Sequence, residues 1–127
     1  MSSSSFLSCA VIGAAGLLFL SMSPALAFEC PKPQAKSGAG VVPESQDEIN
    51  RLSGMLSAGD LDNRLEVIVR DLKEKYPNAD KTELTNFMVS AYCPVIAEDA
   101  GLSDSEKDAR LAGFSQQVWD LYGKEGM

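Results

Sequence analysis

Residues 84–96, LTNFMVSAYCPVI, decide the predicted fold. Apolar side chains recur there at positions i, i+3, i+4, i+7 and i+8, which is the period of one face of an α-helix. At 100° per residue this face covers about 140° of the helix, and its members are Leu84, Phe87, Met88, Ala91, Tyr92 and Val95. A helix with so wide an apolar face must bury it, so we expect this helix to organise a bundle.

Two residues of the stretch depart from the pattern. Cys93 lies about 180° around the helix from Leu84, on the side opposite the apolar face. Pro94 has no backbone N–H, and its ring clashes with the preceding turn, which predicts a kink or break at 93–94. The alternative is that Pro94 opens a separate short turn at residues 94–99.

Three more helices are predicted around this one. Capping boxes, in which a side chain and a carboxylate three residues later satisfy free N–H groups, begin at Ser45, Asp80 and Ser103. A further helix begins at Asp60, after a stop at Gly59, and the last helix runs to about Tyr122 before Gly123. The inward positions are Ile49, Leu52, Met55 and Leu56, then Leu61, Leu65, Ile68, Leu72 and Tyr76, and finally Leu111, Phe114, Val118, Leu121 and Tyr122.

The N-terminal residues 1–27 are predicted to be a cleaved secretory signal peptide. An apolar run at residues 9–20 is followed by Pro24 and by Ala25-Leu26-Ala27, whose small residues suit signal peptidase. The run is too short to cross a bilayer of about 30 Å as a helix, which disfavours the alternative of an uncleaved anchor. Cleavage leaves an extended arm, 28–43, and a single helical domain, 44–127. The fold class is therefore all-α, a small bundle of about four short helices.

The remaining two cysteines, Cys30 and Cys93, are predicted to form one disulfide, because an even pair in an exported chain favours a bond. Closing so long a loop stabilises the fold by about 4 kcal/mol in the chain-entropy model. The bond should lie outside the main core and hold the arm across the back of the central helix, where Val89 also points. A reactive thiol is the alternative, but the chain has neither a CxxC motif nor a histidine to activate one.

The chain is acidic, with 11 basic and 18 acidic residues and a formal net charge of −7. Nucleic acids and anionic membranes require a basic surface, so neither is an expected partner, and no membrane contact is expected after signal cleavage. The charge is interpreted mainly as a source of solubility, with a cationic partner as the alternative. Acids cluster around Gly101 without the spacing of a calcium loop, and they are interpreted as helix-start residues: Glu98, Asp99, Asp104, Glu106 and Asp108.

The absence of histidine excludes the common serine and cysteine triads, HExxH zinc sites and CxxCH haem attachment. Met55 and Met88 lie on apolar faces and are interpreted as core residues, not as copper ligands. We therefore expect no catalytic residue, no cofactor and no metal. A carboxylate pair in a small envelope enzyme or enzyme subunit remains the alternative.

The leading functional hypothesis is a non-catalytic protein, periplasmic or secreted, that acts through contact with an unknown protein partner. It takes two forms: a stress chaperone that loosens in acid, and an inhibitor or immunity-type protein with a rigid face. The candidate partner surface is Trp119 and Tyr122, with the kinked end of the central helix, because tryptophan is enriched in binding hot spots. For Trp119 the alternative is packing at the edge of the core. A self-associating structural component of the envelope is a further alternative.

Overall fold

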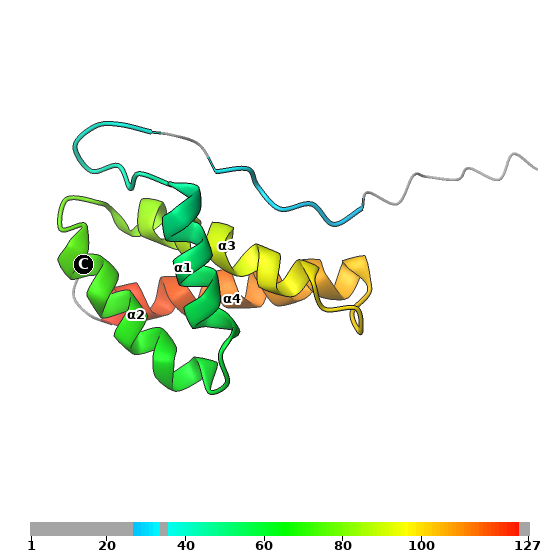
Figure 1. Cartoon of the computed structure of the whole chain (residues 1–127). Coiled ribbons are helices and arrows are strands. Elements are labelled where there is room, and N and C mark those ends of the chain that lie inside the picture. Colours follow the sequence, from blue (N-terminus) through cyan, green and yellow to red (C-terminus); the bar gives the residue numbers. More distant parts are fainter. Residues whose placement is uncertain (1–26, 34–35, 125–127) are drawn as a thin grey trace, which may run out of the picture.

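A computed structural model describes residues 27–33 and 36–124 of the chain. It contains four α-helices, α1 (Gln46–Ser57), α2 (Leu61–Lys75), α3 (Lys81–Ala97) and α4 (Asp104–Lys124) (Figure 1). No strand occurs within the described ranges, and the prediction of a four-helix all-α bundle is confirmed. The predicted signal peptide lies outside the described residues except for Ala27.

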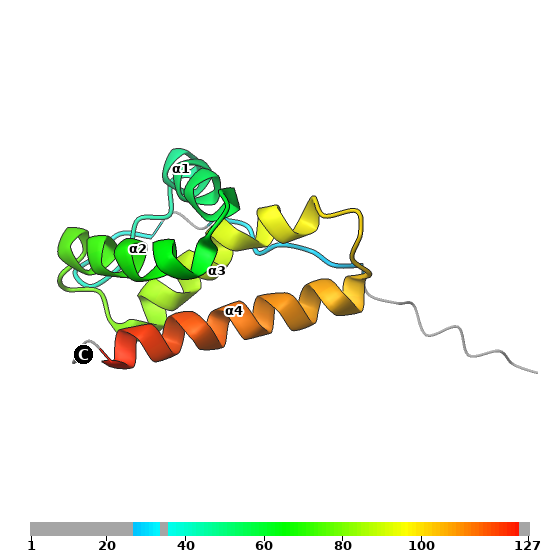
Figure 2. The same ribbon diagram turned by 90° about the horizontal axis from the view of Figure 1, so that it is seen from below.

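The central helix is α3, and both α1 and α4 pack extensively along it, while α2 closes the bundle against α1 and α4. Figure 2 shows α3 lying between α4 and the pair formed by α1 and α2. The apolar face predicted for α3 is buried in the main cluster through Leu84, Phe87, Met88 and Ala91. Burial of such side chains stabilises a fold by about 1.5–3 kcal/mol each, so this face organises the bundle.

The inward positions predicted across the four helices are confirmed with two exceptions. Leu111 and Val95 are only partly buried and lie outside the main cluster. The cluster also contains three residues that the helical periodicity did not predict, namely Val42, Val69 and Ala79. Two of these lie outside the helices, where no repeating pattern marks a buried position.

The helix boundaries differ slightly from the predicted ones. α1 ends at Ser57, and the left-handed residue of the α1–α2 connection is Asp60, at φ 67°, not Gly59. The Asp60 carboxylate accepts hydrogen bonds from the Asn63 side-chain amide at 2.9 Å, which holds this turn. α4 continues through Gly123 to Lys124, so the prediction that Gly123 ends the helix is wrong.

Each of the three predicted capping residues accepts a hydrogen bond from the backbone N–H three residues later, in Ser45–Glu48, Asp80–Glu83 and Ser103–Glu106. The third box is reciprocal, because the Ser103 N–H donates to the Glu106 carboxylate at 2.7 Å. In the first two, the carboxylate serves a contact between distant segments: Glu48 binds Lys75 of α2 at 2.7 Å, and Glu83 accepts from the N–H of Val42 at 3.4 Å.

Pro94 lies inside a single helix, because α3 runs without interruption to Ala97. A break at 93–94 and the alternative of a separate turn at 94–99 are therefore wrong, whereas a kink at this point stays a prediction. A proline leaves the carbonyl four residues before it without its helical donor and weakens the turn that precedes it. The hydroxyl of Ser53, on α1, donates to the Ala91 carbonyl in this turn.

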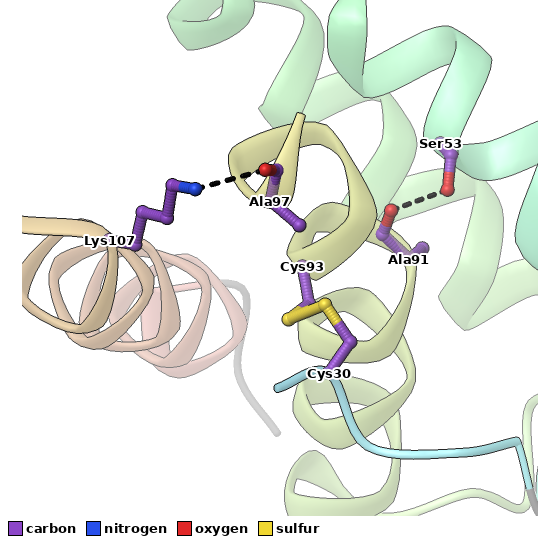
Figure 3. The surroundings of a disulfide bond; sticks show 6 residues. All are labelled: Cys30, Ser53, Ala91, Cys93, Ala97 and Lys107. Atoms are coloured by element: carbon purple, nitrogen blue, oxygen red, sulfur yellow. Dashed lines mark hydrogen bonds between the residues drawn. A yellow bond between two sulfur atoms is a disulfide. The ribbon is translucent and has the colours of Figure 1, made fainter. Parts of the chain in front are cut away.

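The predicted disulfide between Cys30 and Cys93 is present, with a Cα–Cα distance of 5.6 Å. Cys93 is fully buried, yet it lies outside the main cluster, as its position on the back of α3 predicted. The arm begins beside the α3–α4 connection and runs along α3 before turning into α1 (Figures 1 and 2). Figure 3 shows that the disulfide joins the arm to α3 at Cys93, while the Ser53 hydroxyl of α1 reaches α3 at Ala91.

The far end of the arm is also fixed to the bundle. Val42 is fully buried, and the Lys36 ammonium lies 3.7 Å from the Glu83 carboxylate. Gly40 has φ +80°, and a Cβ there would come within 2.8 Å of the Asn78 carbonyl, so this position needs glycine. The arm is thus held at both ends, by the disulfide and by the start of α3.

Candidate partner-binding face

The two residues predicted to form the partner surface lie in different environments. Trp119 is 40 % exposed on α4, whereas Tyr122 is fully buried in the main cluster. Tyr122 is therefore removed from the candidate surface, since a buried ring cannot reach a partner. Its predicted place on the inward face of α4 is confirmed, and Trp119 remains as the candidate anchor.

The Trp119 ring is held by a cation. The Lys81 ammonium, at the start of α3, lies 4.0 Å from the ring centroid. Such cation–π contacts contribute about 0.5–1 kcal/mol at exposed sites. A Cβ at Gly123 would come within 3.1 Å of this ammonium, so glycine leaves room for it. The exposed ring is consequently fixed in position before any partner arrives, which reduces the entropy cost of binding.

Around Trp119, the exposed side of α4 is poor in charge and in bulk. We call it the α4 face, and it consists of Ala112, Gly113, Gln116, Trp119, Asp120 and Gly123, all exposed. Between Arg110 and Lys124 the only charged residue is Asp120. Depletion of charge around an exposed aromatic residue is the composition found at the centre of protein interfaces.

The outer side of α2 makes a sharp contrast with this face. Its 15 residues include eight charged side chains, namely Asp62, Arg64, Glu66, Arg70, Asp71, Lys73, Glu74 and Lys75. A charged helix surface of this kind is the usual solvated exterior of a soluble protein. The α4 face therefore differs from the chain's own ordinary surface.

Gly113 sits in the interior of α4 without an evident reason in the fold. A Cβ built at this position meets no atom within 4 Å in the structure. Glycine in a helix interior costs about 1 kcal/mol relative to alanine. Nothing in the described part of the chain requires that cost, so the space above Gly113 is open for close approach by another molecule.

A groove of about 530 Å³ separates α2 from α4 along one edge of the α4 face. Gly113, Gln116 and Asp120 line it from α4, and Asp62 and Glu66 line it from α2. Glutamine amides orient two of its carboxylates: Gln117 donates to Asp62 at 3.0 Å, and Gln116 donates to Asp120 at 2.9 Å. Sequence periodicity missed this groove, because its walls come from helices far apart in the chain.

The predicted surface at the end of α3 has a second hollow of about 280 Å³ beside it. Ser53 and Gly54 line it from α1, and Pro94, Val95 and Glu98 line it from α3. A third hollow of similar size, about 280 Å³, is apolar and is formed by Met55, Arg64, Val67 and Ile68, with Val67 44 % exposed. Neither hollow adjoins an exposed aromatic side chain.

Two of the acidic residues after α3, Asp99 and Glu106, take part in local structure, and Glu106 does so at the start of α4, as predicted. Asp99 accepts from the Gly101 N–H at 3.0 Å and lies 3.4 Å from the Arg110 guanidinium. Hydrogen bonds from Ser103 lower the pKa of the Glu106 carboxyl from its ordinary value. Within the ranges that the structure describes, no group of three His, Cys, Asp or Glu residues is arranged to hold a metal ion.

Comparison with protein-family models, with curated proteins and with solved structures finds no match to this chain. None of the described helices is long and apolar enough to cross a membrane.

Proposed function

We propose that this chain is an exported, non-catalytic protein that binds a partner protein on the α4 face. The observation that carries the proposal is Trp119, an exposed aromatic ring held by Lys81 within a face that is almost free of charge. Tryptophan is among the side chains that most often dominate binding energy at the centre of an interface, where the surrounding contacts exclude water.

Export is supported by two independent features. The signal-like sequence of residues 1–27 predicts passage through a secretion pathway. The Cys30–Cys93 disulfide is a bond that persists in oxidising compartments, such as the periplasm or the extracellular space. An envelope or secreted location follows as part of the proposal.

The proposal is tested by site-specific photo-cross-linking in cells of the source organism. A photoreactive phenylalanine analogue replaces Trp119 in one variant and the exposed Arg70, on the outer side of α2, in the control. The proposal predicts a protein adduct from position 119 and none from position 70. Equal adducts from both positions, or none from 119, would contradict it.

The masses of the adducts separate the forms of this function. One adduct of defined mass supports an inhibitor or immunity-type protein with a single partner, whereas many adducts that increase in acid support a chaperone. An adduct at twice the chain's own mass supports self-association, as expected for a structural component of the envelope, and contradicts the proposed function.

A further inference from the structure

We infer that the partner presents a basic segment, carrying lysine or arginine side chains, to the groove between α2 and α4. This inference rests on the proposed function and adds the chemistry of the partner. The groove opens onto the α4 face, since Gly113, Gln116 and Asp120 belong to both. A protein docked on Trp119 would therefore cover the groove as well.

The groove is negatively charged. Its lining includes three carboxylates, Asp62, Glu66 and Asp120, and one ammonium, Lys124, which gives a formal charge of −2. Opposite charge across an interface speeds association and selects the partner. The charge of the groove therefore favours a cationic segment over a neutral or acidic one.

These carboxylates differ from the acids elsewhere on the bundle that ion pairs neutralise. Glu48 is paired with Lys75 and Arg51, and Asp99 is paired with Arg110. Within the described residues, no ion pair involves the three groove carboxylates. The neutral amides of Gln117 and Gln116 orient Asp62 and Asp120 without cancelling their charge.

Helix-start chemistry explains only one of the three acids. Asp62 lies in the first turn of α2, where the helix dipole favours negative charge. Glu66 lies a turn further on, and Asp120 lies near the C-terminal end of α4, where the dipole gives it no support. A ligand that supplies positive charge would stabilise all three together.

The dimensions of the groove suit a peptide. Along α4 it extends from Gly113 to Lys124, about 16 Å at 1.5 Å per residue. An extended chain advances about 3.3 Å per residue, so about five residues fill this length. Gly113 allows the backbone of the incoming segment to approach α4 closely, because no side chain stands there.

The test uses the full exported chain and a fluorescent decalysine peptide, with decaglutamate and spermine as comparison ligands. The groove variant is Asp62→Asn with Glu66→Gln, and the matched control is Asp71→Asn with Glu74→Gln, which changes the charge of α2 equally outside the groove. The amides keep the acceptor for Gln117, so the fold is retained, and thermal melting verifies it.

We expect decalysine to bind the native chain and decaglutamate not to bind. The groove variant should bind decalysine about tenfold more weakly, while the control should lose less than about twofold, the loss left by screened surface charge. Equal losses in both variants would show general attraction to an acidic protein and would overturn the inference. Tighter binding of spermine than of decalysine would overturn the assignment of a peptide segment.

The outcomes also separate this inference from the proposed function. Suppose that position 119 gives an adduct and that the groove variant and the control bind decalysine equally. The α4 face would then remain the docking surface, and the inference of a basic segment would be wrong. Suppose instead that only the groove variant loses decalysine binding and that position 119 gives no adduct. The proposed docking on the α4 face would then be wrong, and a basic ligand would remain for the groove alone.

Discussion

The hydroxyl of Ser53 on α1 donates a hydrogen bond to the backbone carbonyl of Ala91 on α3, three residues before Pro94 (Figure 3). The bond joins the two helices at the turn that the proline weakens. The carbonyl that Pro94 deprives of its helical donor is the neighbouring one, of Ser90, so the bond adds support beside this gap without filling it. The packing of α1 on α3 thus strengthens the turn that precedes the proline.

Ser53→Ala should lower the free energy of unfolding by about 1 kcal/mol, the usual contribution of such a bond. Ser57→Ala is the matched control, because the Ser57 hydroxyl donates to Gly54 within its own helix and is exposed. Chemical denaturation of both variants measures the difference. In a Pro94→Ala background the cost of Ser53→Ala should shrink, and an undiminished cost would show that the bond has no connection with the proline.

The disulfide should contribute substantially to stability. Reduction of Cys30–Cys93 should lower the free energy of unfolding by about 4 kcal/mol, since the bond restricts a long loop of the unfolded chain. Thermal melting with and without reductant measures this, and the double variant Cys30→Ser with Cys93→Ala serves as a non-reducible comparison. An equal melting temperature with and without reductant would show that the arm is held by Val42 and Lys36 alone.

The Glu48–Lys75 ion pair should make stability dependent on pH at two limits. Hydrogen bonds from Lys75 and Arg51 lower the pKa of Glu48 from its ordinary value of 4.5. Its stabilising contribution is thus complete above about pH 4.5 and disappears as the pH falls through the lowered pKa. The same pair raises the pKa of Lys75, so the contribution is complete below about pH 10.5 and disappears at more alkaline pH.

Glu48→Gln should therefore destabilise the protein by about 0.5 kcal/mol at neutral pH, because both side chains are partly exposed and screened. This cost should shrink as the pH falls below 4.5 and the native carboxyl binds protons. Urea titrations at pH 3, 5 and 7 measure this, with Glu74→Gln as the exposed control. For the chaperone form, loosening and dye binding should begin only below pH 4.5, where the Glu48 carboxyl starts to bind protons. Dye binding already at pH 5.5 would show that a group other than the Glu48 carboxyl controls this loosening.

Substitution of Trp119 and of Tyr122 should lower the free energy of unfolding by very different amounts, although the two residues lie on the same helix. Tyr122→Ala should cost about 3–5 kcal/mol, as for large core aromatics, because its ring is fully buried. Trp119→Ala should cost clearly less, about 1–2 kcal/mol, because the ring is 40 % exposed and loses only part of a core contact together with the contact to Lys81. Denaturant unfolding followed by circular dichroism compares them, and a large loss for Trp119→Ala would make it a core residue and not a docking anchor.

Much of the fold followed from periodicity. The face from Leu84 to Ala91 and the position of Cys93 on its back could be derived from 100° steps, and the structure confirms both. The burial of Val42 could not be predicted, because the arm has no repeating pattern. This burial depends on where the arm meets the start of α3. Likewise, the acids Glu48 and Glu83 suit a local capping box, but cations and N–H groups from distant segments compete for them.

The candidate site was harder to derive. Residue type predicted Trp119 as a binding anchor, but it also placed Tyr122 on the partner surface. Which of two aromatic side chains at a helix edge is exposed depends on how the neighbouring helices cross, and residue type does not show this. The groove between α2 and α4 depends on the same crossing, so no single stretch of sequence encodes it. Within the groove, Gly113 carries a local signal, as a glycine in a helix interior without a turn to explain it, but Gly54 on α1 carries the same signal outside the site.

That glycine allows the most direct test of the α4 face as a docking surface. Gly113→Ala should raise the free energy of unfolding by about 1 kcal/mol, and so should the control Gly54→Ala on α1, because both helical positions are open. Each change is combined with the photoreactive residue at position 119. If the partner docks on the α4 face, Gly113→Ala should lower the yield of the partner adduct, and Gly54→Ala should leave it unchanged. An equal yield in both backgrounds would contradict it.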